Sequence, residues 1–351
     1  MNRETMNTID FQYGLFLVGE RAFCLWDQDI KKLNLDFLNG IDPEYFEYLA
    51  DTNFEKLGDE KEDIHQHAAL AIRTAFSQGL ETLFALIFAS VQAPHCVPAW
   101  MNKYKNSELY DLVRKVSKYE SFLSLLKTQH VVDWKTLSNV VHDALILEDK
   151  EKEISIKNGF GSLWTQFATI YLQDGFSEEY NSIKHGLRVR SGGFSFAMGV
   201  EDKPGIPAPA ERMVLMGKSK FGTSYYDVEE IEDLKRHVQI TRSSRNWDPE
   251  DMVWGLKLIS LSISNIVSAL RVFNGTNAVE VQFHWPNDLE AFKEPSKRSR
   301  SLGVTSSGFK TIIPKEVITA FSKEEIIQKY LDGKFLDVKH FHLGNQETNK
   351  P

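Results

Sequence analysis

The strongest constraint on the fold is a long apolar pattern with the period of a helix, running from Glu60 to Gln92. Apolar residues recur there at steps of three and four, which is typical of a helix that buries one face. The second half, Leu80–Ala93, is apolar on nearly all sides, so we expect it at the centre of a helical bundle. It contains Glu81 and stops at Pro94, whereas a membrane span needs about 20 apolar residues. We therefore expect a buried helix and no contact with a membrane.

Other helices are indicated by their caps and by amphipathic spacing. Asp248 is a good N-cap, Pro249 suits the first helical position, and Asn274-Gly275 ends the pattern, which predicts a long helix over residues 248–275. The charged run Glu148–Glu153 reads as a solvated connector. Shorter helices are expected after Asp42-Pro43, near Ser107–Val116, Tyr119–Lys127, Trp134–Leu147 and Leu163–Gln173, and after the Ser322/Glu325 capping box.

After residue 186 the apolar period changes from helical to alternating. Leu187 and Val189 alternate with arginines, and the alternation resumes after Gly192-Gly193, which predicts a β-hairpin with a two-residue glycine turn. Further strands are expected at 212–217, 224–231, 237–242 and 279–285, with a partly helical conformation as the alternative for 224–231 and 237–242. The predicted class is mainly α, a helical bundle with a small antiparallel β-sheet inserted or appended (α+β).

Five segments describe the expected organisation of the 351 residues, 42% of which are hydrophobic. In chain order they are an aromatic-rich N-terminal segment packing on the body (1–58), a helical bundle (59–186), a hairpin and small sheet (187–247), a long helix returning to the bundle (248–275), and a strand, basic loop and C-terminal helix (276–351).

Charge and cysteine usage restrict the function classes. The formal net charge of -8 disfavours broad binding to nucleic acid, so any such binding needs a local basic patch. The two cysteines, Cys24 and Cys96, fit a reducing cytoplasm better than a disulfide scaffold. The N-terminus has no pattern of a secretory signal. A cytoplasmic location is therefore expected.

Familiar enzyme motifs fail on inspection. The stretch "MGKSKFG" resembles a phosphate loop, but the first glycine of that motif would fall on Arg212. "NGFGSLW" has only Gly159 and Gly161 of a dinucleotide fingerprint, and no "GxSxG" occurs. These absences leave none of the common nucleotide-binding or hydrolase signatures.

Metal sites are not predicted either. His65 and His67 fall on a helix, where residues two apart point in nearly opposite directions. His340 and His342 would share a strand face with Asp337 nearby. An isolated pair of histidines near the chain end, however, is typical of surface residues that bind no metal. The basic run Lys297–Arg300 reads as a solvated loop, with phosphate contact as the alternative. We expect no metal and no cofactor.

One stretch combines helix caps with acid–base chemistry: "SEEYNSIKHGLRVR". Ser177 suits an N-cap and Gly186 the left-handed position after the last turn, which predicts a helix of about two turns. Asn181 and His185 are four residues apart and so share one helix face. A histidine of ordinary pKa beside cations has the groups that metal-free RNA cleavage requires. The candidate catalytic residues are therefore His185, Asn181 and Arg188, and the candidate substrate-binding residues are Lys184, Arg190 and Arg73.

The segment "YNSIKHG" resembles the signature of the HEPN superfamily (higher eukaryote and prokaryote nucleotide-binding), in which Arg-Asn is followed after three residues by His on a helix of an α-bundle. Asn181 and His185 match this pattern, while Tyr180 stands where the family has arginine. The resemblance implies a homodimer and a metal-independent ribonuclease of defence or toxin–antitoxin systems, or a relative that only binds RNA. Arg188, Arg190 or Arg73 would then replace the missing arginine.

The alternative hypothesis is a non-catalytic protein–protein interaction module. The tyrosine at the arginine position and the acidic net charge motivate it. Trp100, Trp247 or Trp285 would serve as exposed anchors for a protein partner, although tryptophan is more often buried.

Overall fold

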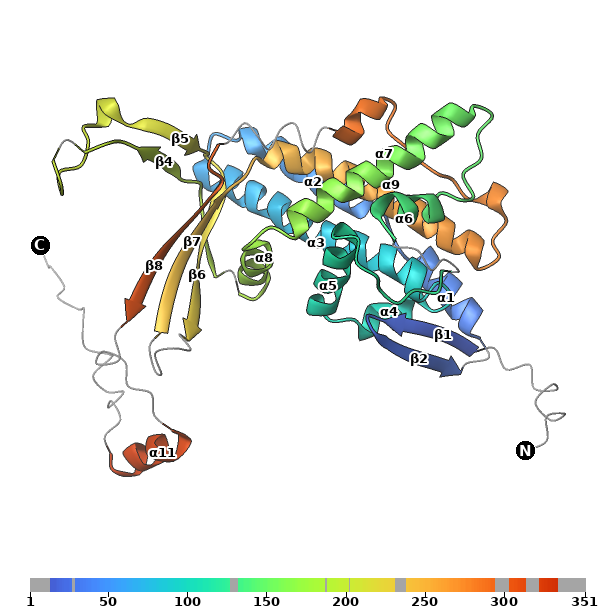
Figure 1. Ribbon diagram of the computed structural model, residues 1–351, viewed down its shortest axis with the longest axis horizontal. Coiled ribbons are helices and arrows are strands. Elements are labelled where there is room, and N and C mark those ends of the chain that lie inside the picture. The colour runs from blue at the N-terminus through green and yellow to red at the C-terminus, as the bar shows by residue number, and fades with distance from the viewer. Residues whose placement is uncertain are drawn as a thin grey trace, which may run out of the picture. The chain divides into compact units, whose positions relative to one another are not determined.

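The computed structural model describes residues 13–26, 29–126, 132–186, 188–201, 203–230, 238–293, 303–313 and 322–333. Within these ranges helices predominate and the strands form small antiparallel sheets, which confirms the predicted mainly α, α+β class (Figure 1). The chain divides into two compact units. The larger contains Met1–Tyr225 and Ser243–Ser307, and the smaller contains Tyr226–Arg242 and Gly308–Pro351.

The helices and strands of the described residues follow one another in this order: β1 (Tyr13–Val18), β2 (Arg21–Trp26), α1 (Ile30–Asn39), α2 (Tyr45–Phe54), η2 (Glu55–Gly58), α3 (Glu62–Gln92), α4 (Val97–Lys103), α5 (Asn106–Ser117), α6 (Trp134–Val141), α7 (Lys150–Tyr171), α8 (Phe176–Lys184), β3 (Val189–Ser191), β4 (Ser195–Met198), η3 (Ala210–Arg212), β5 (Val214–Lys218), β6 (Gly222–Glu230), β7 (Val238–Asn246), α9 (Pro249–Phe273), η4 (Ala278–Glu280), η5 (Leu289–Lys293), β8 (Ser306–Ile313) and α11 (Lys323–Leu331). The sheets have the strand orders β1-β2, β3-β6-β7-β8 and β4-β5.

The core of the larger unit is built on α3 and α9, which lie along each other (Figure 1). Glycine permits this close approach from both sides. A Cβ on Gly79 of α3 would lie 3.3 Å from Ile259, and a Cβ on Gly255 of α9 would lie 2.6 Å from the ring of Phe76. Helix α2 packs against both α3 and α9. The apolar pattern that predicted a central helix is therefore confirmed.

Length and composition alone would let α3 and α9 cross a membrane. In each helix 72% of the most apolar window is buried inside the protein.

The long helix α9 begins where its caps predict, but the segment after it is not the expected strand. Asp248 accepts a hydrogen bond from the backbone N–H of Glu250, and the helix ends at Phe273 with Asn274 as its C-cap. Polar side chains of α9 then bind the following backbone. The Asn265 amide donates to the carbonyl of His284 at 2.8 Å and accepts from its N–H at 2.7 Å. Side chains thus replace a neighbouring strand, so no ladder forms over 279–285.

Helix α7 includes residues that we expected to form a solvated connector. It begins at Lys150, because the Asp149 side chain caps it by accepting from the N–H of Lys152 at 3.0 Å. Within the helix, Glu153 pairs with Lys157 at 2.9 Å, one turn later. Glu151 and Glu153 lie in the first turn, where the helix dipole favours them. The connector prediction was therefore wrong.

The helix expected at Tyr119–Lys127 does not form. Helix α5 ends at Ser117, and Tyr119 has a positive φ of 57°, which turns the chain out of helical geometry. The N–H of Glu120 reaches back to the carbonyl of Lys115 at 2.8 Å and closes the helix end. The chain then continues without helix to residue 126, where the described range ends.

The glycine pair at 192–193 connects strands that belong to two different sheets and does not form a hairpin turn. Strand β3 pairs with β6, whereas β4 pairs with β5. Gly192 has a φ of +114°, and a Cβ on Gly193 would lie 2.3 Å from the carbonyl oxygen of Ser219. Backbone passes too close to Gly193 for any side chain, which is why glycine is required there. The hairpin prediction was wrong, although the strands exist.

The N-terminal part is more regular than expected. Strands β1 and β2 form a hairpin whose turn, at Gly19, is held by Gln92 of α3 through two hydrogen bonds of 3.2 and 3.1 Å. The helix predicted after Asp42 begins later, at Tyr45. Both Cys24 and Cys96 are free thiols.

Candidate functional site

Helix α8 carries the predicted motif and is anchored at its first turn. Its N-cap is Gly175, with a φ of +77°, and not the predicted Ser177. Tyr225 of β6 donates a hydrogen bond to the carbonyl of Gly175 at 2.9 Å, and a Cβ on Gly175 would lie 2.7 Å from that hydroxyl. Close contact with β6 thus sets the start of α8.

The inner face of α8 carries a buried carboxylate, Glu179, which is 0% exposed. Arg73 of α3 donates to it in an ion pair, and the Thr223 hydroxyl donates to it from β6. The indole N–H of Trp247 donates to Glu179 at 3.1 Å, and the Nε of Arg245 lies 3.7 Å from it. One carboxylate therefore joins α8 to α3, to β6 and to the start of α9.

The two arginines outweigh the single carboxylate in this buried cluster, which we call the Arg–Glu–Arg cluster (Arg73, Glu179 and Arg245). Burial alone would raise the pKa of Glu179, but Arg73, the hydrogen bonds and Arg245 together hold that pKa below its ordinary value. Burial lowers the pKa of the Arg245 guanidinium, and Arg73 lowers it further. The cluster carries two positive charges against one negative charge.

The predicted site residues divide into an outer and an inner set. Lys184, His185, Arg188 and Arg190 are exposed, and we call them the basic group. Arg73 is 4% exposed and paired with Glu179, so the structure does not bring it to the basic group.

Asn181 and His185 lie one turn apart but in different surroundings. Asn181 is half-buried and lines a cavity of about 350 Å³ together with Glu81, Glu178 and Tyr180. His185 is the exposed C-cap, with φ -98° and ψ 49°, and is not among the residues that line this cavity. The amide and the imidazole therefore do not face one common cavity.

The cavity beside Asn181 has acidic and phenolic walls. Burial and the nearby Glu81 raise the pKa of Tyr180 to about 12, and the pKa of Tyr104 rises to about 12 for the same reasons. The Lys184 ammonium lies 4.0 Å from Glu81 and 4.7 Å from the centre of the Tyr180 ring. A phosphate at Asn181 would lie beside carboxylates, which disfavours it.

The described residues contain no group of three or more His, Cys, Asp and Glu side chains that could hold a metal ion. His65 is buried and His67 is exposed, in keeping with their spacing on a helix. The predicted features at 297–300 and 337–342 lie outside the described residues.

The tryptophans do not serve as exposed anchors. Trp100 is 0% exposed and Trp247 is 5% exposed. Trp285 is partly buried and packs against the core of the larger unit. This part of the interaction hypothesis was wrong, because all three rings contribute to packing.

Two polar residues of the interior were missed from the sequence. Glu179 was not among the candidate residues, yet it follows Phe176 by three residues and precedes Ile183 by four, which is the spacing of a buried face. A carboxylate at such a position signals a buried cation partner. His142 is 0% exposed, with its Nδ1 2.8 Å from the Ser138 carbonyl and its Nε2 3.1 Å from the Asn265 amide nitrogen.

The chain matches no protein-family model, no curated protein and no solved structure, so its likeness to the HEPN superfamily consists of the short motif around Asn181 and His185.

Proposed function

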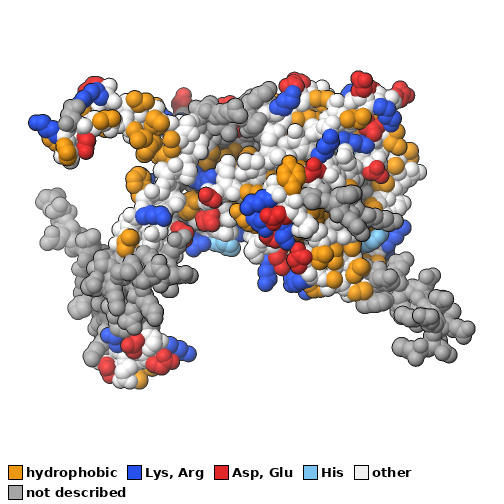
Figure 2. All heavy atoms as spheres, in the orientation of Figure 1, with side chains coloured by type: hydrophobic (Ala, Val, Ile, Leu, Met, Phe, Trp, Pro, Cys, Tyr) orange, Lys and Arg blue, Asp and Glu red, His pale blue; other side chains and the backbone are white. Residues whose placement is uncertain are grey.

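We propose that the protein is a non-catalytic interaction module that associates with a second copy of itself through the β4–β5 ribbon, defined as strands β4 and β5. The observation that carries this proposal is the exposure of large apolar side chains on the ribbon. Met198 is 57% exposed, Val214 65% and Leu215 57%. Figure 2 shows these strands as a surface rich in hydrophobic side chains.

Both faces of the ribbon are apolar. Met198 lies opposite Val214, and Ala197 lies opposite Leu215. Neighbouring residues of a strand point to opposite faces, so the two pairs lie on different faces. A lone two-stranded ribbon is marginally stable in water, and apolar patches of this kind mark interaction surfaces. Covering both faces would stabilise the ribbon.

The free edge of β4 favours a second copy as the partner. Backbone covers part of the outer edge of β5, since Gly217 bridges to Gly303 and the N–H of Val304 donates to the carbonyl of Met216. In the described part of the chain, β4 has β5 as its one strand partner.

Natural edge strands are usually blunted by lysine or proline, and the segment Ser195–Val200 has neither. It is uncharged, so two copies can pair antiparallel across a twofold axis without repulsion at the contact.

Replacing Met198 by lysine is expected to dissociate the dimer. The substitution places a charge twice in a twofold interface, and each lost methionine contact costs about 1.5–3 kcal/mol, so the dimer dissociation constant should rise by about 100-fold or more. Light scattering after size exclusion measures the mass of each species. Ile146→Lys, at a 77% exposed position away from the ribbon, is the matched control. Wild type that stays monomeric at high concentration, or a dimer insensitive to Met198→Lys, would remove this proposal.

Binding of RNA by the basic group is the second candidate function. Its members are all exposed and lie within a stretch of seven residues. Among the described residues, no ion pair holds Arg188 or Arg190. Such cations bind phosphate and release counterions. Binding is favoured over cleavage because Asn181 lines an acidic cavity that His185 does not share.

The double variant Arg188→Ala/Arg190→Ala is expected to weaken binding of single-stranded RNA by about tenfold or more, and to flatten the slope of log affinity against log salt by about 1.4. Fluorescence anisotropy at several salt concentrations checks both values. Lys32→Ala/Lys118→Ala changes the net charge equally at exposed sites elsewhere. Equal losses in the two double variants would exclude a specific basic site. Cleavage in excess chelator that disappears in His185→Ala would instead establish catalysis.

A further inference from the structure

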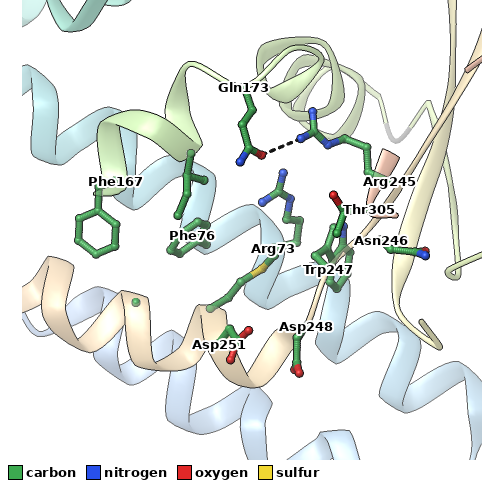
Figure 3. A pocket seen from close by; sticks show the side chains of 13 residues that line it. Arg73, Phe76, Phe167, Gln173, Arg245, Asn246, Trp247, Asp248, Asp251 and Thr305 are labelled. Carbon is green, nitrogen blue, oxygen red and sulfur yellow. Dashed lines mark hydrogen bonds between the residues drawn. The ribbon is translucent and has the colours of Figure 1, made fainter. Parts of the chain in front are cut away.

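A partly open cavity of about 150 Å³ lies against the Arg–Glu–Arg cluster in the larger unit. Figure 3 shows Arg73, Arg245 and Gln173 directed toward one another from α3, β7 and the end of α7. The Arg245 guanidinium donates to the Gln173 side-chain oxygen at 3.0 Å, which leaves the Gln173 amide N–H groups available to a ligand. This side of the cavity is rich in hydrogen-bond donors.

The donors on this side are incompletely satisfied. Arg73 is 4% exposed, and its Nε has no hydrogen-bond partner. Within the described ranges its one ion pair goes to Glu179, which also faces Arg245. An unpartnered N–H and a surplus positive charge in a buried place are both costly. A bound anion would relieve both costs at once.

Another part of the wall is apolar. Phe76, Phe167, Ile170 and Met252 line this part. A volume of about 150 Å³ is large enough for a ring the size of benzene. The site can therefore hold a compact apolar body attached to the anionic group.

The charge of the ligand follows from the same lining. Within the Arg–Glu–Arg cluster two guanidinium groups face one carboxylate, so this side of the cavity favours one further negative charge. Asp248 and Asp251 also line the cavity, on the side away from Gln173 and Arg245 in the view of Figure 3. A dianion such as a phosphate monoester would bring a second negative charge close to Asp248, which disfavours it.

We propose that this cavity is a binding site for a small organic monocarboxylate, whose carboxylate is held by Arg73, Arg245 and Gln173 and whose apolar body packs against Phe76 and Phe167. The site is separate from the β4–β5 ribbon and from the basic group, so it does not depend on either proposed function. The site gives the larger unit a small-molecule ligand in addition to a macromolecular partner.

Benzoate tests this site, with benzamide as the uncharged control of the same shape. At constant ionic strength and pH 7, benzoate is expected to raise the melting temperature of the full chain by about 2 °C or more once it exceeds its dissociation constant tenfold. Benzamide is expected to leave the melting temperature unchanged. Equal shifts from the two compounds, or no shift from benzoate, would overturn the proposal.

Two variants connect the shift to the cavity. Ile170→Trp fills it without touching the charges, and Gln173→Met removes a donor at an exposed position that tolerates substitution. Both should abolish or strongly reduce the benzoate shift while keeping a cooperative melting transition. Ile154→Trp, on the exposed part of α7, is the control and should respond like wild type. A full benzoate shift in either cavity variant contradicts the site.

Discussion

Replacing Glu179 by alanine is expected to lower the free energy of unfolding by about 3–5 kcal/mol, because it leaves two guanidinium groups buried without their counterion. Glu179 is 0% exposed, and Arg73, Arg245, Thr223 and Trp247 all direct polar groups at it. The lost stability therefore has two sources: the arginines lose their counterion, and Thr223 and Trp247 lose the acceptor of their hydrogen bonds. Urea unfolding followed by circular dichroism measures it.

The neighbouring residue supplies the control for this experiment. Glu178 lies on the same helix turn but is exposed, so Glu178→Ala should change stability by about 0.5 kcal/mol or less. The double variant Glu179→Leu/Arg73→Met should lose less unfolding free energy than the single variants Glu179→Leu and Arg73→Met lose together. The difference, which is the coupling energy of the pair, should be about 1 kcal/mol or more. Additive losses, or a Glu179→Ala cost no larger than that of Glu178→Ala, would contradict a stabilising role for the cluster.

The second large effect is a dependence of stability on pH through His142. Burial is the main cause that lowers its pKa to about 4, from an ordinary 6.5. Between these values the unfolded chain binds a proton that the folded chain does not, so stability falls as the pH falls from 6.5 to 4. The full difference is about 3 kcal/mol. The neutral ring stacks on Phe160 at 4.6 Å. Since the Asn265 amide can only donate to Nε2, the ring proton is on Nδ1 and is donated to the Ser138 carbonyl.

His142→Gln removes the titration and is expected to flatten the curve of unfolding free energy against pH. The slope should fall by up to about 1.4 kcal/mol per pH unit between pH 6.5 and 4, relative to wild type. Urea titrations at several pH values in this window supply the two curves. His67→Gln alters an exposed histidine of α3 and should leave the slope unchanged. Parallel curves for wild type and His142→Gln would show that this histidine does not control acid stability.

Periodicity predicted the elements whose own residues determine them. Helices α3 and α9 carry strong apolar patterns, and the Asp248 cap lies where the sequence places it. The predictions of secondary structure were wrong where side chains from distant parts of the sequence determine the local conformation. Asn265 binds the backbone of His284, and this bond replaces the strand pairing that the alternation of 279–285 suggested. Nothing local in the sequence reveals that contact.

In the candidate site, too, local features were predictable from the sequence and contacts between distant residues were not. That Asn181 and His185 share a short helix follows from spacing alone. Which of their neighbours enter the interior depends on β6 and β7, which contribute Thr223 and Arg245 from far along the chain. The buried role of Glu179 was therefore missed, although its spacing from Phe176 and Ile183 was available.

The pairing of α3 with α9 has a consequence for how the protein is synthesised. The 156 residues from 93 to 248 separate the two helices, and α3 is the more N-terminal of the two. During translation the apolar side of α3 emerges long before α9 can cover it. Late closure of such a contact slows folding and leaves the nascent chain prone to association with other apolar surfaces. Chaperones that hold unfolded apolar segments should thus engage ribosome-bound chains between the emergence of α3 and that of α9.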